Sequence, residues 1–295
     1  MNEASHSPDR LAAATGRLLA TAAALSGAQA REPSLLPGWT RGHVLSHIAR
    51  NADGMVNHDE SFGKKIRARS EGETVAYTGD VTVGGPPDAR EITGLTVTKL
   101  AVGPMDNNAY LLQCTQTGEL MLIDAANEAP RLLELLGGRP LSRIVTTHRH
   151  WDHWQALAEV QTATGAAVIA HHDDADELPV QVTTRVSHGD TVPVGTREIS
   201  VIHLRGHTPG SIALCYDAGG ELADTPHLFT GDSLFPGGPG NTEHDPKRFG
   251  QLMDDLEERV FGTLPDGAWV YPGHGKDTTL GTERPHVQEW RARGW

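Results

Sequence analysis

The chain has 295 residues, enough for one large domain or two smaller ones, each with its own hydrophobic core. Hydrophobic residues make up 38% of the sequence and charged residues 21%, which is typical of a globular protein and excludes a largely disordered one. The formal net charge of −13 argues against nucleic acid and anionic membranes as partners, because both select for lysine and arginine patches.

Residues 1–58 are predicted to form a helical hairpin. Leu11, Leu18 and Leu25 fall at the spacing of an amphipathic helix. The same stretch imitates a secretion signal, but Glu3 spoils the basic segment that such a signal needs. No apolar run reaches the roughly 18 residues of a membrane span. We therefore expect a cytoplasmic protein.

The second helix of the hairpin carries a resemblance to a known family. The run from Leu36 to Asp53 resembles the opening of the mycothiol-dependent maleylpyruvate isomerases, a family of DinB-like four-helix bundles. In that family the histidine that matches His47 is a metal ligand. The resemblance stops near residue 58, so His43 and His47 either share a cation or only pack. A hairpin alone cannot bury its apolar stripe, so we expect it to dock on the rest of the chain or to form a homo-oligomer.

Residues 59–94 are charged and then rich in glycine and proline, which predicts a linker. Residues 95–295 alternate short apolar runs with helical patterns, which predicts an α/β domain. Cys114 and Cys215 each lie in a strand-like run and are interpreted as buried free thiols. The expected strands are 95–102, 109–114, 119–123, 142–145, 166–170, 198–204 and 211–216, and the expected helices are 129–136, 154–160 and 247–261.

Three histidines and an aspartate follow the strand predicted at 142–145. An extended strand end alternates its side chains, so His148 and His150 are expected to point to the same side, where one cation could bind both. Asp152 and His153 are expected in the first turn of a helix, beside that pair. Two neighbouring ions are therefore the economical interpretation, and imidazole with carboxylate suits zinc, iron or manganese. The alternative is a polar loop that happens to hold three histidines.

Later segments add further candidate ligands at strand ends or in loops. His207 lies in a Gly-His-Thr-Pro-Gly turn, Asp232 follows an apolar run, and His274 ends a Pro-Gly-His sequence. Asp124, at another strand end, is expected to orient an imidazole rather than to bind metal. The polar run 171–174 has no partners at ligand spacing and is interpreted as a solvated loop. Together, these motifs leave little room for the polar-loop alternative.

In this order, the motifs of residues 95–295 resemble those of the metallo-β-lactamase superfamily, and within it the glyoxalase II (hydroxyacylglutathione hydrolase) branch. The resemblance implies an αβ/βα sandwich with two divalent metal ions at the edge of the sheets, zinc ahead of iron or manganese. The implied ligands are His148, His150 and His207 for the first ion, Asp152, His153 and His274 for the second, and Asp232 as a bridge between them.

The resemblance implies a metal-dependent hydrolase whose metal-bridging hydroxide attacks a small-molecule acyl thioester. Asp152 is expected as the catalytic group that orients the nucleophile or takes its proton. The N-terminal resemblance suggests mycothiol as the thiol carrier. Two alternatives remain, a mononuclear iron persulfide dioxygenase and a general ester or lactone hydrolase of the same fold. Persulfide dioxygenases usually read Pro-Ala-His where this chain has Pro272, Gly273 and His274, which favours hydrolysis.

Overall fold

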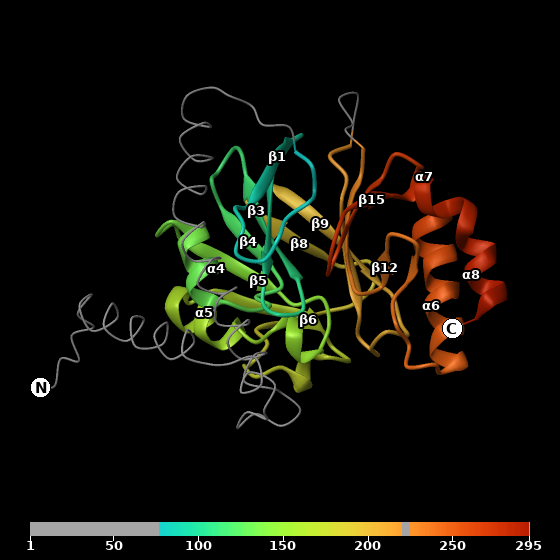
Figure 1. Cartoon of the computed structure of the whole chain (residues 1–295). Coiled ribbons are helices and arrows are strands. Elements are labelled where there is room, and N and C mark those ends of the chain that lie inside the picture. Colours follow the sequence, from blue (N-terminus) through green and yellow to red (C-terminus); the bar gives the residue numbers. More distant parts are fainter. Residues whose placement is uncertain (1–76, 220–224, 295) are drawn as a thin grey trace, which may run out of the picture. The chain divides into compact units, whose positions relative to one another are not determined.

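A computed structural model describes residues 77–219 and 225–294 (Figure 1). The predicted helical hairpin, with His43 and His47, lies outside the described residues, as does the first part of the predicted linker. Among the helices that are described, none is both long enough and apolar enough to cross a membrane.

The first sheet has seven strands in sequence order. Strands β1 to β4 pair antiparallel, and β4 to β7 pair parallel. Parallel neighbours need a crossover, and α4 and α5 supply two of them. The elements are β1 (Asp88–Ile92), β2 (Leu95–Val102), β3 (Asn107–Cys114), β4 (Leu120–Ile123), α4 (Ala129–Leu136), β5 (Leu141–Val145), the 3₁₀ turn η1 (Trp151–His153), α5 (Leu157–Thr164), β6 (Ala167–His171), the 3₁₀ turn η2 (Ala175–Glu177) and β7 (Thr184–Val186).

The second sheet has six strands in the order β15-β14-β11-β10-β9-β8, and β12 and β13 form a separate short pair. A long crossover that contains α6 joins the parallel strands β11 and β14. The elements are β8 (Thr191–Val194), β9 (Arg197–His203), β10 (Ile212–Tyr216), β11 (His227–Gly231), β12 (Leu234–Phe235), β13 (Gly238–Pro239), α6 (Pro246–Leu256), the π-helical turn η3 (Glu257–Phe261), β14 (Trp269–Pro272), β15 (Thr278–Thr279), α7 (Leu280–Glu283), the 3₁₀ turn η4 (Arg284–His286) and α8 (Val287–Arg293).

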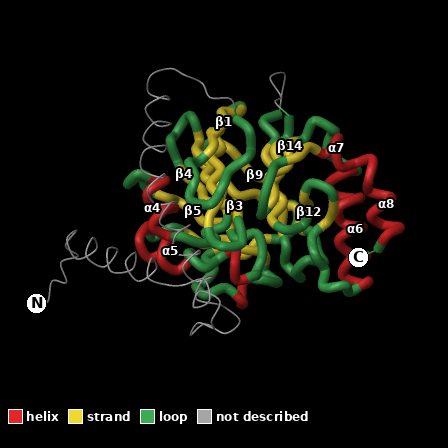
Figure 2. Tube along the Cα trace, viewed as in Figure 1, coloured by secondary structure: helices red, strands yellow, loops and turns green. Residues whose placement is uncertain are grey.

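Three clusters of buried apolar side chains hold these layers together. One lies between the first sheet and α4 and α5, one between the two sheets, and one between the second sheet and α6 and α8. Along β2, Leu95 and Val97 belong to the cluster between the sheets, whereas Leu100 and Val102 belong to the outer one. This alternation follows the two-residue period of a strand. Figure 2 shows helices on both outer sides of the strands, which confirms the predicted αβ/βα sandwich.

Helix ends follow local sequence signals. The helix α4 ends at Gly137, which has a left-handed φ of 59°, as the Gly-Gly pair after the predicted helix indicates. Asp245 caps α6, because its Oδ1 accepts hydrogen bonds from the backbone N–H of Lys247 (2.8 Å) and of Arg248 (3.1 Å). The buried Cys114 and Cys215 are free thiols, as predicted.

Two boundaries, and the local structure at His148 and His150, differ from the prediction. The sheet starts within the predicted linker, because β1 pairs with β2 over its whole length. The helix expected at 154–160 begins only at Leu157, and His153 belongs to the 3₁₀ turn η1 before it. Strand β5 ends at Val145, where the predicted strand also ends, but His148 and His150 lie in a loop after it and not in an extended continuation of the strand. Their approach therefore depends on the packing of this loop.

Candidate metal centre

All seven predicted ligands come together where strands of both sheets end. Among the residues that the structure describes, four groups of side chains are close enough to hold a metal ion, and three of these groups consist entirely of predicted ligands. The segments that carry them are the loop after β5 (His148 and His150), η1 (Asp152 and His153), the turn after β9 (His207), the residue after β11 (Asp232) and the loop after β14 (His274).

The first triad consists of His148, His150 and His207, whose candidate ligand atoms all lie within 4.8 Å of one another. The Nε2 atoms of His148 and His207 are 3.3 Å apart. The ring of His150 lies 4.8 Å from that of His148 and 4.5 Å from that of His207, between centroids. These three imidazoles could hold one metal ion.

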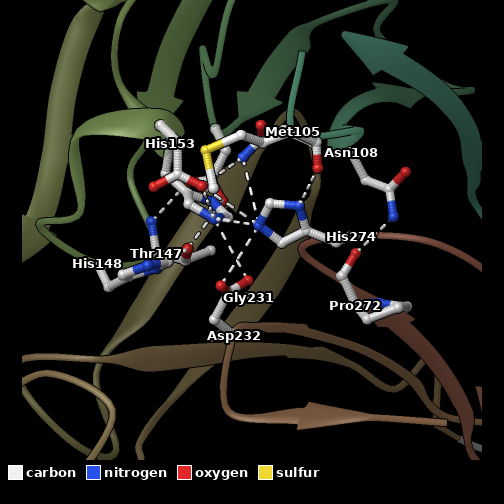
Figure 3. Close-up of polar contacts among 12 residues, drawn as sticks. Met105, Asn108, Thr147, His148, His153, Gly231, Asp232, Pro272 and His274 are labelled. Atoms are coloured by element: carbon white, nitrogen blue, oxygen red, sulfur yellow. Dashed lines mark hydrogen bonds and ion pairs between the residues drawn. The ribbon is translucent and has the colours of Figure 1, made fainter. Parts of the chain in front are cut away.

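The second triad consists of Asp152, His153 and His274 and meets the same distance limit. The Nε2 atoms of His153 and His274 are 3.2 Å apart, and His274 Nε2 lies 3.3 Å from Asp152 Oδ2. Figure 3 shows His274 and His153 converging on the same space beside Asp232. This triad could hold a second ion.

Asp232 contacts both triads with one carboxylate. Its Oδ2 lies 3.6 Å from Nε2 of His207 and 3.4 Å from Nε2 of His274, and its Oδ1 lies 3.3 Å from Nε2 of His153. Oδ1 is buried and accepts no hydrogen bond. The carboxylate of Asp232 therefore faces both triads.

Asp124 sets the tautomers of two of the histidines. His153 Nδ1 lies 2.8 Å from Asp124 Oδ2, so it must carry a proton and donate to the carboxylate. Thr147 Oγ1 donates to the same oxygen (2.7 Å) and so accepts from Nδ1 of His148 (3.0 Å). The lone pair of each neutral ring is therefore on Nε2, which faces the centre. The predicted role of Asp124 in orienting an imidazole is confirmed.

Backbone carbonyls set the tautomers of His207 and His274. His207 Nδ1 donates to the carbonyl oxygen of Asn241 (2.7 Å), and His274 Nδ1 donates to that of Met105 (2.9 Å). Four Nε2 atoms thus face one another and two carboxylates across gaps of 3.2 to 3.6 Å, and in the neutral rings each of them is an acceptor. Acceptors that face each other repel unless a cation lies between them, so the donor set fits divalent metal ions.

The pKa values separate the two triads. Burial and the neighbouring His153 hold the pKa of His148 well below its usual range, and burial lowers the pKa of His207 to about 4. Burial also acts to lower the pKa of His274, but the carboxylates of Asp152 and Asp232 outweigh it and raise this pKa to about 9. The first triad is therefore neutral, whereas the second attracts positive charge.

Two asparagines at the start of β3 support the second triad and were missed in the sequence. Asn107 Nδ2 donates to Asp152 Oδ2 (2.9 Å). Asn108 Nδ2 donates to the carbonyl oxygens of Pro272 and Gly275 (2.9 Å each), on both sides of His274. Two adjacent amides in an otherwise apolar strand were the available signal, because buried amides need partners.

The interpretation of residues 171–174 as a solvated loop holds for the exposed His172 and Asp173 but is wrong for the other two residues. His171 and Asp174 are buried, and Asp174 contacts the loops of the first triad. His171, Asp173 and His203 also meet the distance limit for a metal-binding group. However, the rings of His171 and His203 are stacked, with centroids 3.8 Å apart and 28° between planes, so their in-plane lone pairs do not converge on one point.

Comparison with known proteins agrees with this geometry. Residues 102–279 match the family described as the metallo-beta-lactamase superfamily. Residues 11–94 match the mycothiol maleylpyruvate isomerase N-terminal domain, beyond the residue 58 at which the predicted resemblance stops.

Individual relatives point the same way. A hydroxyacylglutathione hydrolase from Polaromonas sp. is 35% identical over 170 residues, which cover 57% of this chain and 62% of the relative. The chain thus spans less than two thirds of that relative's length. The crystal structure of ETHE1 from Myxococcus xanthus is 30% identical, with a TM-score of 0.57 over 66% of this chain and 84% of that one. The structure of TTHA1623 in a di-iron-bound form is 32% identical, with a TM-score of 0.52 over 63% of this chain and 96% of that one.

The superfamily match covers more than half of the chain, and the sandwich places the clustered histidines and aspartates at the ends of its strands. The chain belongs to the metallo-beta-lactamase superfamily.

Proposed function

We propose that the protein is a binuclear metal-dependent hydrolase that cleaves an acyl thioester of a low-molecular-weight thiol. The observation that carries the proposal is the convergence of four Nε2 atoms and two carboxylates, with Asp232 in contact with both triads. The similarity to hydroxyacylglutathione hydrolases supports a thioester as the substrate class. The di-iron-bound form of TTHA1623 supports two ions rather than one.

In this proposal each triad holds one ion and Asp232 bridges them. When bound, the two divalent ions, zinc ahead of iron or manganese, supply Lewis acidity and make hydroxide available near neutral pH. The ligands are His148, His150 and His207 for the first ion, and Asp152, His153 and His274 for the second.

Asp152 is proposed to orient the attacking water. Burial acts to raise the pKa of Asp152, but His274, His153 and the hydrogen bond from Asn107 hold it below its usual range. The carboxylate therefore stays ionised at neutral pH and accepts hydrogen bonds. Because so weak a base takes up a proton poorly, orientation of the water is its main contribution, and proton uptake is secondary.

Two exposed apolar side chains belong to residues beside candidate ligands. Met105 is 48% exposed and its carbonyl accepts from His274, while Trp151 is 54% exposed and lies between His150 and Asp152. Apolar surface beside a polar centre suits a small organic substrate. The match of residues 11–94 to a mycothiol-dependent family supports mycothiol as the carrier of the acyl group.

The test is hydrolysis of S-lactoyl thioesters of mycothiol, glutathione and coenzyme A. We expect at least one to be cleaved, with His150→Ala lowering kcat/KM by roughly a hundredfold or more, since the first ion loses one of three imidazoles. If no thioester is cleaved faster by the native protein than by this variant, the thioesterase proposal fails. If the protein instead binds one iron per chain and consumes oxygen when a thiol persulfide is supplied, it is a persulfide dioxygenase and not a thioesterase.

Gly273 is predicted to be required for the second ion. A Cβ at this position would lie 2.1 Å from Asp232 Oδ1 and 2.7 Å from His153 Cε1. The backbone cannot retreat, because Gly273 N–H donates to the carbonyl of Gly231 (2.8 Å) and its own carbonyl accepts from the N–H of Asn108 (2.7 Å). Any side chain at 273 must therefore displace Asp232 or His153.

We expect Gly273→Ala to weaken binding of the second ion by roughly a hundredfold, the upper end for the loss of a supporting contact. Elemental analysis after dialysis should then find the metal content falling from two ions per chain toward one. Gly250→Ala is the matched control, because a Cβ there has no heavy atom within 4 Å. Two tightly held ions in Gly273→Ala would contradict the prediction.

A further inference from the structure

Asp174 is a buried carboxylate outside the seven candidate ligands. It lies between β6 and η2, and its side chain is 1% exposed. Its nearest cationic group, Arg149 Nε, is 3.9 Å away, which is too long for a hydrogen bond. A buried carboxylate is costly unless hydrogen bonds stabilise its charge, so its partners show what it does in the fold.

Those partners belong to the two loops that carry the first triad. Asp174 Oδ2 accepts from the backbone N–H of Arg149 (3.0 Å) and from Thr208 Oγ1 (2.5 Å), and Oδ1 accepts from the backbone N–H of Gly210 (2.8 Å). Arg149 lies between His148 and His150 in the chain, and Thr208 directly follows His207. One carboxylate thus joins both loops.

The packing around this carboxylate leaves little freedom. A Cβ at position 210 would lie 2.7 Å from Asp174 Cγ, so the turn after His207 lies directly against the carboxylate. Thr208 makes a second hydrogen bond, because its backbone N–H donates to Ser211 Oγ (3.0 Å). The two loops are also linked by the hydrogen bond from Ile212 N–H to the Thr147 carbonyl (2.9 Å). Asp174 therefore completes a rigid connection beside the histidines.

We propose that Asp174 is a positioning residue that fixes His207 relative to His148 and His150, and thereby sets metal affinity at the first triad but not at the second. This inference rests on the proposed assignment of one ion to each triad. Carboxylates that hold ligand-bearing groups contribute roughly 10- to 100-fold to metal affinity. Asp174 acts on two loops at once, whereas its contacts do not include Asp152, His153 or His274.

The test isolates each triad before Asp174 is changed. His274→Ala leaves the first triad as the complete one, and His207→Ala leaves the second. Asp174→Asn keeps the size of the side chain but replaces an acceptor oxygen by an NH₂ group that faces hydrogen-bond donors. Zn²⁺ affinity is measured by competition with a chromophoric chelator, so the result does not depend on thioester turnover.

We expect Asp174→Asn to weaken Zn²⁺ binding roughly 10- to 100-fold in the His274→Ala background and to leave it unchanged in the His207→Ala background. When Asp174→Asn is the only substitution, the protein should lose one ion per chain on dialysis and regain it as the free Zn²⁺ concentration is raised. Asp176→Asn, two residues further along and exposed, is the matched control. Equal affinities in the His274→Ala background, or equal losses in both backgrounds, would overturn the proposal.

Thr208→Val covers the case in which Asp174→Asn does not fold. It removes the hydroxyl that donates to Asp174 and keeps the size of the side chain. We expect a smaller loss of Zn²⁺ affinity in the same background, several-fold, because one of three hydrogen bonds is removed. No loss at all would count against the proposal. If the expected losses of Zn²⁺ affinity are found but no thioester is cleaved, the role of Asp174 is supported and only the proposed function is refuted.

Discussion

Replacing Asp232 by alanine is expected to lower kcat/KM by roughly 10³-fold or more, about 4 kcal/mol of transition-state stabilisation, and to remove both metal ions. The reason is that Asp232 is the one predicted ligand whose oxygens lie within 3.6 Å of nitrogen atoms in both triads. Without its charge, the Nε2 lone pairs of His153, His207 and His274 would face one another with less to attract a cation.

The measurements are the metal content after dialysis and the rate of thioester hydrolysis. Asp232→Asn keeps the shape of the side chain and should lose nearly as much, because an amide binds divalent cations more weakly than a carboxylate does. Asp176→Ala, an exposed aspartate paired with Arg185, should change neither quantity. An Asp232→Ala protein that retains two ions per chain would rule out the bridging role.

Replacing Lys99 by methionine is expected to lower the free energy of unfolding by about 3–5 kcal/mol. Lys99 is fully buried, and its Nζ donates to Asp277 Oδ1 (2.6 Å) and to the carbonyl oxygens of Gly79 and Gly275 (2.7 Å each). Removing the ammonium group leaves the buried Asp277 carboxylate without its counter-charge. Burial lowers the pKa of Lys99, whereas Asp277 acts in the opposite direction and favours its charged form.

Chemical denaturation of the metal-free protein measures this effect. Lys276→Met is the matched control, because Lys276 and its partner Asp80 are 72% and 49% exposed, and such surface pairs contribute at most about 1 kcal/mol. The double variant Lys99→Met with Asp277→Asn should be more stable than Lys99→Met alone, since it no longer buries an unpaired charge. Equal losses for Lys99→Met and Lys276→Met would contradict the prediction.

The Lys99 contact also concerns the metal centre. The carbonyl of Gly275 accepts from both Lys99 and Asn108, and it directly follows His274. A loss of stability at Lys99 should therefore be accompanied by weaker metal binding in the second triad. Lys99 lies on the face of β2 that turns toward the other sheet, on the same side as Leu95 and Val97, where alternation alone leads one to expect an apolar residue.

Much of the fold could be predicted from local patterns. The strand at 95–102 and the helix at 129–136 have the predicted bounds, because apolar periodicity and a Gly-Gly stop depend only on neighbouring residues. The seven candidate ligands were also recognisable, since imidazoles and carboxylates cluster in short motifs beside apolar runs. The end of this strand at Val145 was predicted, but His148 and His150 were expected in an extended continuation and lie in a loop, because their own sequence does not show how the chain turns after the last paired residue.

The sequence by itself determined the alternation of strands and helices and the chemistry of the ligand set, because both follow from residue type and short spacing. Only the tertiary structure decided which nitrogen of each histidine faces the centre, that Asp174 is buried between two loops, and that Lys99 pairs with Asp277. The physical reason is that burial and hydrogen-bond partners are properties of segments far apart in the chain. From sequence alone a charged residue is expected to be exposed to solvent, because only the fold shows which distant segment covers it and supplies its partner.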